Sequence, residues 1–65
     1  MKMCEAKAVV VEGEKEEVAM EDVTFLYFKD GKPVLRNIMG EEMTFEDYEI
    51  EGVDFVHHVI YLRLR

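Results

Sequence analysis

Short strand-forming runs alternate with glycine-containing turns along the whole chain, and this alternation restricts the fold more than any other feature. Four brief stretches hold all four glycines and the only proline: 12–16 (EGEKE), 29–33 (KDGKP), 39–42 (MGEE) and 51–54 (EGVD). The runs between them are rich in Val, Ile, Phe, Tyr and Thr, which favour extended backbone. Closely spaced runs of this kind are typical of small barrels and sandwiches. The pattern therefore predicts a single all-β domain, residues 1–65, with a barrel-like sheet.

We expect about six or seven short strands from these runs. They cover 7–12, 17–20, 23–29, 33–39, 43–46, 48–55 and 58–65. The Asp-Gly pair in 29–33 predicts a hairpin, because both residues tolerate a positive φ. Segments 14–23 and 41–50 contain helix formers, but the apolar residues of 14–23 cover little of a helical face, so strand is favoured. In the last run Ile60, Leu62 and Leu64 share one side of the strand.

A chain of 65 residues with one cysteine needs stabilisation beyond its own core. It buries only about 60% of the surface that its unfolded form exposes. Domains of this size often rely on disulfides, a metal or a partner subunit, and a single cysteine excludes an internal disulfide. A small sheet also leaves edge strands exposed, which pairing with an identical chain would cover. We therefore expect a bound metal ion, a homodimer, or both.

Composition indicates a cytoplasmic protein with no membrane segment. The chain is 49% hydrophobic, which is too apolar for disorder. No stretch approaches the ~20 apolar residues that cross a bilayer. Glu5 and Lys7 interrupt the basic-then-apolar pattern of a signal peptide. An unpaired thiol suits a reducing compartment.

The formal net charge of −7 makes nucleic acid an unlikely partner. Fifteen Asp and Glu face eight Lys and Arg, and the basic residues are scattered, whereas phosphate binding needs clustered ones. Aromatic side chains can stack on bases in RNA-binding barrels, but we expect most of them to fill the core. They are Phe25, Tyr27, Phe28, Phe45, Tyr48, Phe55 and Tyr61. An RNA-binding module remains an alternative function.

Catalytic motifs are missing from the sequence, so we expect no enzyme. The chain contains no serine, and its only threonines, Thr24 and Thr44, lie in strand patterns without a signature around them. No glycine-rich phosphate loop is present. Cys4 and a histidine would be the only nucleophile–base pair available, and nothing in their spacing supports it.

Metal binding is the chemistry that the residues favour, although the spacing of the candidate ligands along the sequence matches no strong metal-binding motif. The soft and borderline ligands are Cys4, His57 and His58. Neighbours in a strand point to opposite faces, so we expect the two histidines at the surface, near the tip of the last hairpin. A two-fold axis near Cys4 would bring two thiolates to one ion. With two backbone or terminal nitrogens they would form an S2N2 set, which suits Ni(II) and Cu(II). Two alternatives to a metal ligand remain for Cys4: a partly buried side chain on the first strand, or an intermolecular disulfide.

The chain resembles the CooT family of small nickel-binding proteins. The opening MCEAKAVVV (3–11) is similar to the family's Met-Cys-x-Ala-Lys start, and the likeness continues through 17–62, ending in VDFVHHVIYL. The resemblance implies an SH3-like β-barrel that forms a homodimer. It also implies a metallochaperone that supplies nickel to carbon monoxide dehydrogenase, with Ni(II) held by one Cys4 thiolate from each chain.

One departure from the family concerns the residues before the cysteine. Here Met-Lys precedes Met-Cys. A chain that started at Met3 and lost that methionine would give Cys4 a free α-amine to chelate the ion, whereas in the chain as written Cys4 offers only an amide. HypC-type hydrogenase chaperones also begin Met-Cys, but they carry Pro-Gly soon after it and end in a helix. The sequence has neither feature, so a protein-interaction adaptor of that type is a second alternative.

Overall fold

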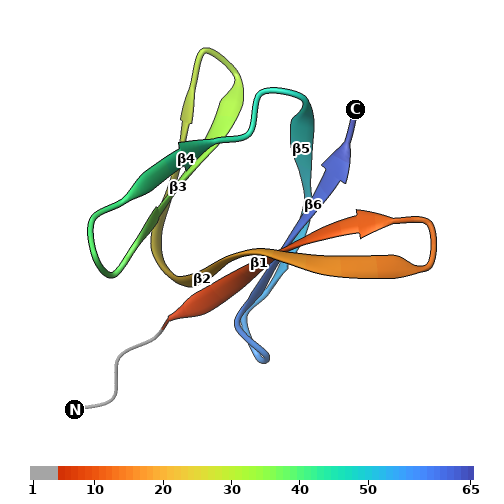
Figure 1. Ribbon diagram of the computed structural model, residues 1–65, viewed down its shortest axis with the longest axis horizontal. Helices are drawn as coiled ribbons and strands as arrows, with labels where there is room; N and C mark the ends of the chain where they lie inside the picture. Colours follow the sequence, from red (N-terminus) through yellow and green to blue (C-terminus); the bar gives the residue numbers. More distant parts are fainter. Residues whose placement is uncertain (1–4) are drawn as a thin grey trace.

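The computed structural model describes residues 5–65, and in this part of the chain it contains six β-strands and no helix (Figure 1). The strands are β1 (Ala6–Glu12), β2 (Lys15–Lys29), β3 (Lys32–Asn37), β4 (Glu42–Thr44), β5 (Tyr48–Asp54) and β6 (Val59–Leu64). The all-β prediction is confirmed. Over the same residues no helix is long and apolar enough to cross a membrane. The last element is a strand, unlike the terminal helix of HypC-type adaptors.

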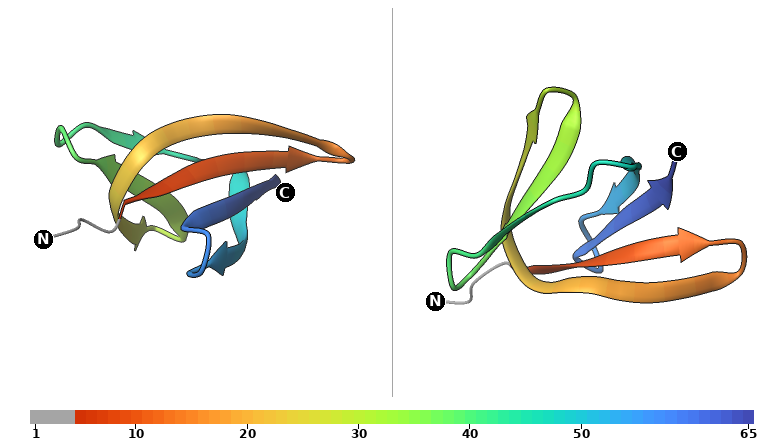
Figure 2. Two further views of the ribbon diagram at one scale, coloured as in Figure 1. Left: turned by 90° about the horizontal axis from the view of Figure 1, so that it is seen from below. Right: turned by 45° about the horizontal axis from the view of Figure 1, so that its top comes forward.

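All six strands belong to one sheet in the order β4-β3-β2-β1-β6-β5. Neighbouring strands run antiparallel, except β1 and β6, which run parallel. The sheet curls until β3 contacts β5, which makes a half-barrel (Figure 2). The strand order places β1 well inside the sheet, paired along both of its sides.

One long strand replaces two of the strands that the sequence predicts. We expected separate strands at 17–20 and 23–29, but β2 runs without a break through both. Its first half pairs with β1 and its second half with β3. Between the two halves Asp22 adopts a φ of 55°, a left-handed conformation that aspartate tolerates better than most residues. The chain therefore bends sharply at Asp22 and continues as the same strand.

Three of the four glycines lie in turns, whereas the turns at 45–47 and 55–58 contain no glycine. Asp30 and Gly31 both have a positive φ, 52° and 77°, as a two-residue hairpin requires, so the predicted β2–β3 hairpin is confirmed. Gly13 and Gly40 also lie in turns. Gly52 lies inside β5 instead, at a shift in its register with β6, where it marks an irregularity in the edge strand.

The core lies inside the curl of the sheet and draws on most of the strands. Its buried cluster consists of Ala8, Val23, Leu35, Phe45, Ile60 and Leu62. Two of the three β6 residues that share one side, Ile60 and Leu62, are buried as their alternation indicates. Leu64 on the same side is 51% exposed, because the end of the strand extends past the core.

This difference along β6 gives a test of the fold. Leu62→Ala should lower the free energy of unfolding by about 2–5 kcal/mol, because it opens a cavity in a fully buried position. Leu64→Ala, the matched control two residues on, should cost below about 1 kcal/mol. Urea denaturation followed by circular dichroism measures both values. Equal losses in the two variants would contradict the placement of the core.

Candidate metal site

The first residues of β1 lie where two other segments of the chain meet. Antiparallel pairing sets Ala6 opposite Val23 of β2, one residue past the β2 bend. Parallel pairing sets Lys7 opposite Val59 of β6, the first residue after the β5–β6 turn. Because neighbouring strands are only about 4.8 Å apart, the bend and the turn flank the start of β1 from both sides.

A polar hollow of about 340 Å³ lies at this junction. Its lining comes from the start of β1, the β2 bend and the β5–β6 turn: Glu5, Ala6, Lys7, Glu21, Asp22, His57 and His58. Cys4, the predicted metal ligand, lies outside the residues that the structure describes. The peptide bond nevertheless joins Cys4 to Glu5, with consecutive Cα atoms about 3.8 Å apart. The cysteine is thus tethered to a residue of the hollow.

The two histidines lie in the β5–β6 turn, as predicted for the last hairpin. The turn spans residues 55–58, and its last residue, His58, has a φ of 58°. The backbone carbonyl of His58 accepts a hydrogen bond of 3.0 Å from the Lys7 N–H. This bond fastens the histidine turn to the beginning of β1, next to Glu5.

Asp54, the last residue of β5, organises the histidine turn. Its Oδ1 accepts hydrogen bonds of 2.9 Å from the backbone N–H groups of Val56 and His57. Its Oδ2 lies 2.8 Å from Nδ1 of the His57 ring. The hydrogen bonds from the His57 backbone and then from the His57 ring hold the pKa of the Asp54 carboxyl below its ordinary value. Asp54 is therefore ionised at neutral pH and fixes both the backbone and the ring of His57.

The pairing with Asp54 decides which ring nitrogen of His57 carries the hydrogen. An ionised carboxylate can only accept hydrogen bonds, so Nδ1 must donate. In the neutral ring Nε2 then has a lone pair and is the nitrogen that can bind a metal ion. The sequence analysis missed this partnership, although the Asp54-x-x-His57 spacing in DFVH was available as its signal.

The described residues contain no ready-made group of metal ligands. Among residues 5–65 no three side chains of His, Cys, Asp or Glu are arranged as a metal site. The hollow nevertheless offers donors that suit a borderline divalent cation, namely an imidazole and carboxylates. A complete site at this end of the molecule needs a further ligand, and Cys4 is the nearest candidate along the chain.

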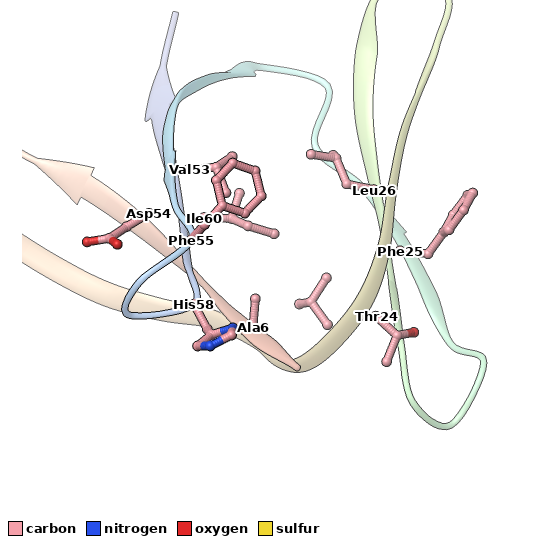
Figure 3. Close-up of a pocket in the computed structure, with 10 residues that line it drawn as sticks. Ala6, Thr24, Phe25, Leu26, Val53, Asp54, Phe55, His58 and Ile60 are labelled. Carbon is pink, nitrogen blue, oxygen red and sulfur yellow. The ribbon is translucent and has the colours of Figure 1, made fainter. Parts of the chain in front are cut away.

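An apolar groove of about 460 Å³ adjoins the polar hollow (Figure 3). Its lining residues are Ala6, Val23, Thr24, Phe25, Leu26, Val53, Asp54, Phe55, His58 and Ile60, so it shares Ala6 and His58 with the hollow. Phe55, one of these lining residues, is 82% exposed, and Val56, next along the turn, is 80% exposed. Large apolar side chains this exposed and this close together are typical of a protein interface.

The aromatic residues do not fill the core as expected. Phe45 alone of the seven is buried, and Tyr48 packs against its ring edge-on. On β2, Phe25 is 49% exposed, and the Arg36 guanidinium lies 4.7 Å from its ring centre. The expectation was wrong because the curl of the sheet gives a small interior, which aliphatic side chains and one phenylalanine fill.

An ionic network of exposed side chains joins β2, β3 and β4. Arg36 donates to Glu42 at 2.9 Å, and the Tyr27 hydroxyl donates to the same carboxylate at 3.0 Å. The hydrogen bond from Arg36 and then that from Tyr27 lower the pKa of Glu42, and Glu42 in turn raises the pKa of Tyr27. The Arg36 guanidinium beside Phe25 is thus already paired with a carboxylate.

Comparisons with known proteins agree on one family. The family model described as the CO dehydrogenase accessory protein CooT matches residues 3–63, and curated protein sequences give no match. A crystal structure from Carboxydothermus hydrogenoformans, of a protein provisionally named CooT, is similar with a TM-score of 0.86 and 34% sequence identity. That likeness covers 95% of this chain and 98% of the other. The chain therefore belongs to the CooT family of CO dehydrogenase accessory proteins.

Proposed function

We propose that this protein is a homodimeric Ni(II)-binding metallochaperone in which the Cys4 thiolates of two protomers hold the ion. The membership of the CooT family carries the proposal, because the matched region, residues 3–63, includes Cys4. The family is described as an accessory to CO dehydrogenase. This description supports nickel as the cargo and CO dehydrogenase as the receiving enzyme. In this proposal the half-barrel is the SH3-like barrel of the family.

Two protomers are needed because one chain has one thiol. Each chain contains a single cysteine, and residues 5–65 contain no three-ligand group of their own. A two-fold axis beside Glu5 doubles every donor at that point, giving two thiolates for one ion. Thiolates with nitrogen donors form the square-planar sets that suit Ni(II), with Cu(II) as the competing ion.

The apolar groove and the neighbouring Phe55 and Val56 are the surface on which we place the second protomer. The groove shares Ala6 and His58 with the polar hollow, so a protomer docked there brings its own N-terminal end close to the first. A chain of 65 residues has a small core, so a partner that covers exposed apolar surface adds to its stability. One interface would thus stabilise the barrel and assemble the metal site.

The small number of protein ligands favours delivery over storage. An ion held by two thiolates at the edge of a small dimer stays accessible to the ligands of a second protein, so it can exchange. Thiolates persist as metal ligands where disulfides do not form, which supports a cytoplasmic location in this proposal. CO dehydrogenase lacking its nickel is the proposed acceptor.

The first test is a Ni(II) titration of the metal-free protein followed by ultraviolet–visible absorption. We expect a thiolate-to-nickel charge-transfer band that saturates at one ion per two chains and disappears in Cys4→Ser, because the thiolate is the ligand. A chain that begins at Met3 and loses that methionine has a free α-amine on Cys4. Its Ni(II) affinity, compared with that of the full chain, measures the contribution of this amine. Unchanged Ni(II) affinity in Cys4→Ser would refute the proposed function.

The second test concerns the dimer surface. Phe55→Glu should raise the dimer dissociation constant about thirtyfold or more, because it replaces an aromatic side chain at the interface with a charged one. Phe28→Glu is the matched control, since Phe28 is also exposed, at 59%, but does not line the groove. Sedimentation velocity over a range of concentrations measures both constants. A dimer that Phe55→Glu leaves intact would place the interface elsewhere.

A further inference from the structure

We propose that the free edge of β2, residues 15–21, is a strand-addition site for an extended segment of a partner protein that carries lysine or arginine. The site is separate from the apolar groove, and of its residues only Glu21, at the end, also lines the polar hollow. Two properties of the edge point to this role, namely its unpaired backbone and its uncompensated negative charge.

The first half of β2 is paired along one side only. Residues 15–23 pair with β1, whereas the pairing with β3 covers residues 23–29 and ends in a 2.8 Å hydrogen bond from the Ile38 N–H to the Asp22 carbonyl. Within the described chain β2 comes close to no strand other than β1 and β3, and the β1–β2 hairpin extends past the other strands (Figure 1). Alternate residues of a paired strand direct their N–H and C=O groups away from the partner. The free edge therefore presents unpaired donors and acceptors to solvent.

The two ends of the sheet are less open than this edge. At one end β4 has only three residues. At the other end β5 has a register shift at Gly52 and comes close to β3 where the sheet curls. Short strands, irregularities and covered edges are common means of keeping a sheet edge from pairing. The free edge of β2 has no strand across from it, and its one irregularity, at Ala19, leaves residues 15–18 in regular register with β1.

Most of the net negative charge of the protein lies around this edge. Between residues 12 and 22 the chain has six carboxylates and one ammonium, all on exposed residues, which is a net charge of −5 out of −7. In the described chain the ion pairs and side-chain hydrogen bonds engage carboxylates between residues 41 and 54, and none between 12 and 22. The charge beside the free edge is therefore available to a partner.

This charge decides what can occupy the edge. A second copy paired edge to edge would bring two acidic segments together, and like charges on neighbouring strands are destabilising. The glutamates thus protect the edge from pairing with itself. A basic extended segment gains backbone hydrogen bonds and also places its cations opposite Glu16 and Glu17. Val18, on the same face as Glu16, is 53% exposed and offers that segment an apolar contact.

The experiment titrates the full chain with three short synthetic peptides. The first alternates lysine with valine or threonine, the second has glutamate in place of each lysine, and the third is the lysine peptide with N-methyl groups on its central backbone nitrogens. Amide hydrogen exchange followed by NMR should show slower exchange within residues 15–21 on saturation with the lysine peptide, and no change with the glutamate peptide. The methylated peptide should bind about tenfold more weakly or worse, because it cannot donate the central hydrogen bonds.

Charge-reversal variants test the role of the glutamates. Glu16→Lys should weaken binding of the lysine peptide about threefold to tenfold, because a cross-strand attraction becomes a repulsion. Asp47→Lys is the matched control, since it makes the same change in net charge at an exposed residue before β5, a strand that β1 and β6 separate from β2. Because the solvent screens charges at that separation, Asp47→Lys should alter binding by below about twofold. Circular dichroism of both variants checks that the fold is retained.

Each contrary outcome would overturn the proposal. Equal binding of the methylated and unmethylated lysine peptides would show that charge alone attracts them, without strand addition. Protection confined to β5 or to the apolar groove would place the peptide elsewhere, and a lack of saturable binding would remove the site altogether. Slow exchange within residues 15–21 that appears without peptide and increases with protein concentration would identify a second copy as the occupant.

Discussion

The pairing of β1 on both of its sides is the constraint on which the rest of the structure depends. A strand inside a sheet satisfies its backbone donors and acceptors in both directions, and Ala8 and Val9 in the middle of β1 are accordingly almost fully buried. The hydrogen bond between Lys7 and His58 extends this pairing to the residue just before the start of β6. The bend in β2 and the β5–β6 turn are thereby held on either side of the same few residues. The polar hollow thus lies among the ends of paired strands, which position side chains well.

Local chemistry allowed much of the fold to be predicted, and contacts between distant residues decided the remainder. The Asp30–Gly31 hairpin and the turns at Gly13 and Gly40 follow from the residues themselves. The continuity of β2 does not, because Asp22 takes its left-handed conformation where the strand changes partner from β1 to β3. The exposure of the aromatic residues likewise depends on how far the sheet curls, which no short stretch of sequence determines.

The candidate site, too, was predicted from the sequence only in part. Cys4 was predicted from its rarity and from the resemblance of its surroundings to one family. The polar hollow could not be predicted, because its lining residues Glu5 and His57 are brought to one place only through the parallel pairing of β1 with β6. Some of the surface charges are paired. Lys32, Arg36 and Arg63 form ion pairs with carboxylates on neighbouring segments. The remaining carboxylates give this small protein a field that attracts divalent cations and repels phosphates.

The parallel pairing of β1 with β6 also has a consequence for how the protein is made. The first strand leaves the ribosome early, but its partner begins at Val59 and is made last. Joining the two closes a loop of nearly the whole chain, which costs conformational entropy and slows folding. Until β6 has been made, the start of β1 has no histidine turn held beside it. A nascent chain, or one clipped before β6, therefore carries the start of β1 without the polar hollow that the turn completes.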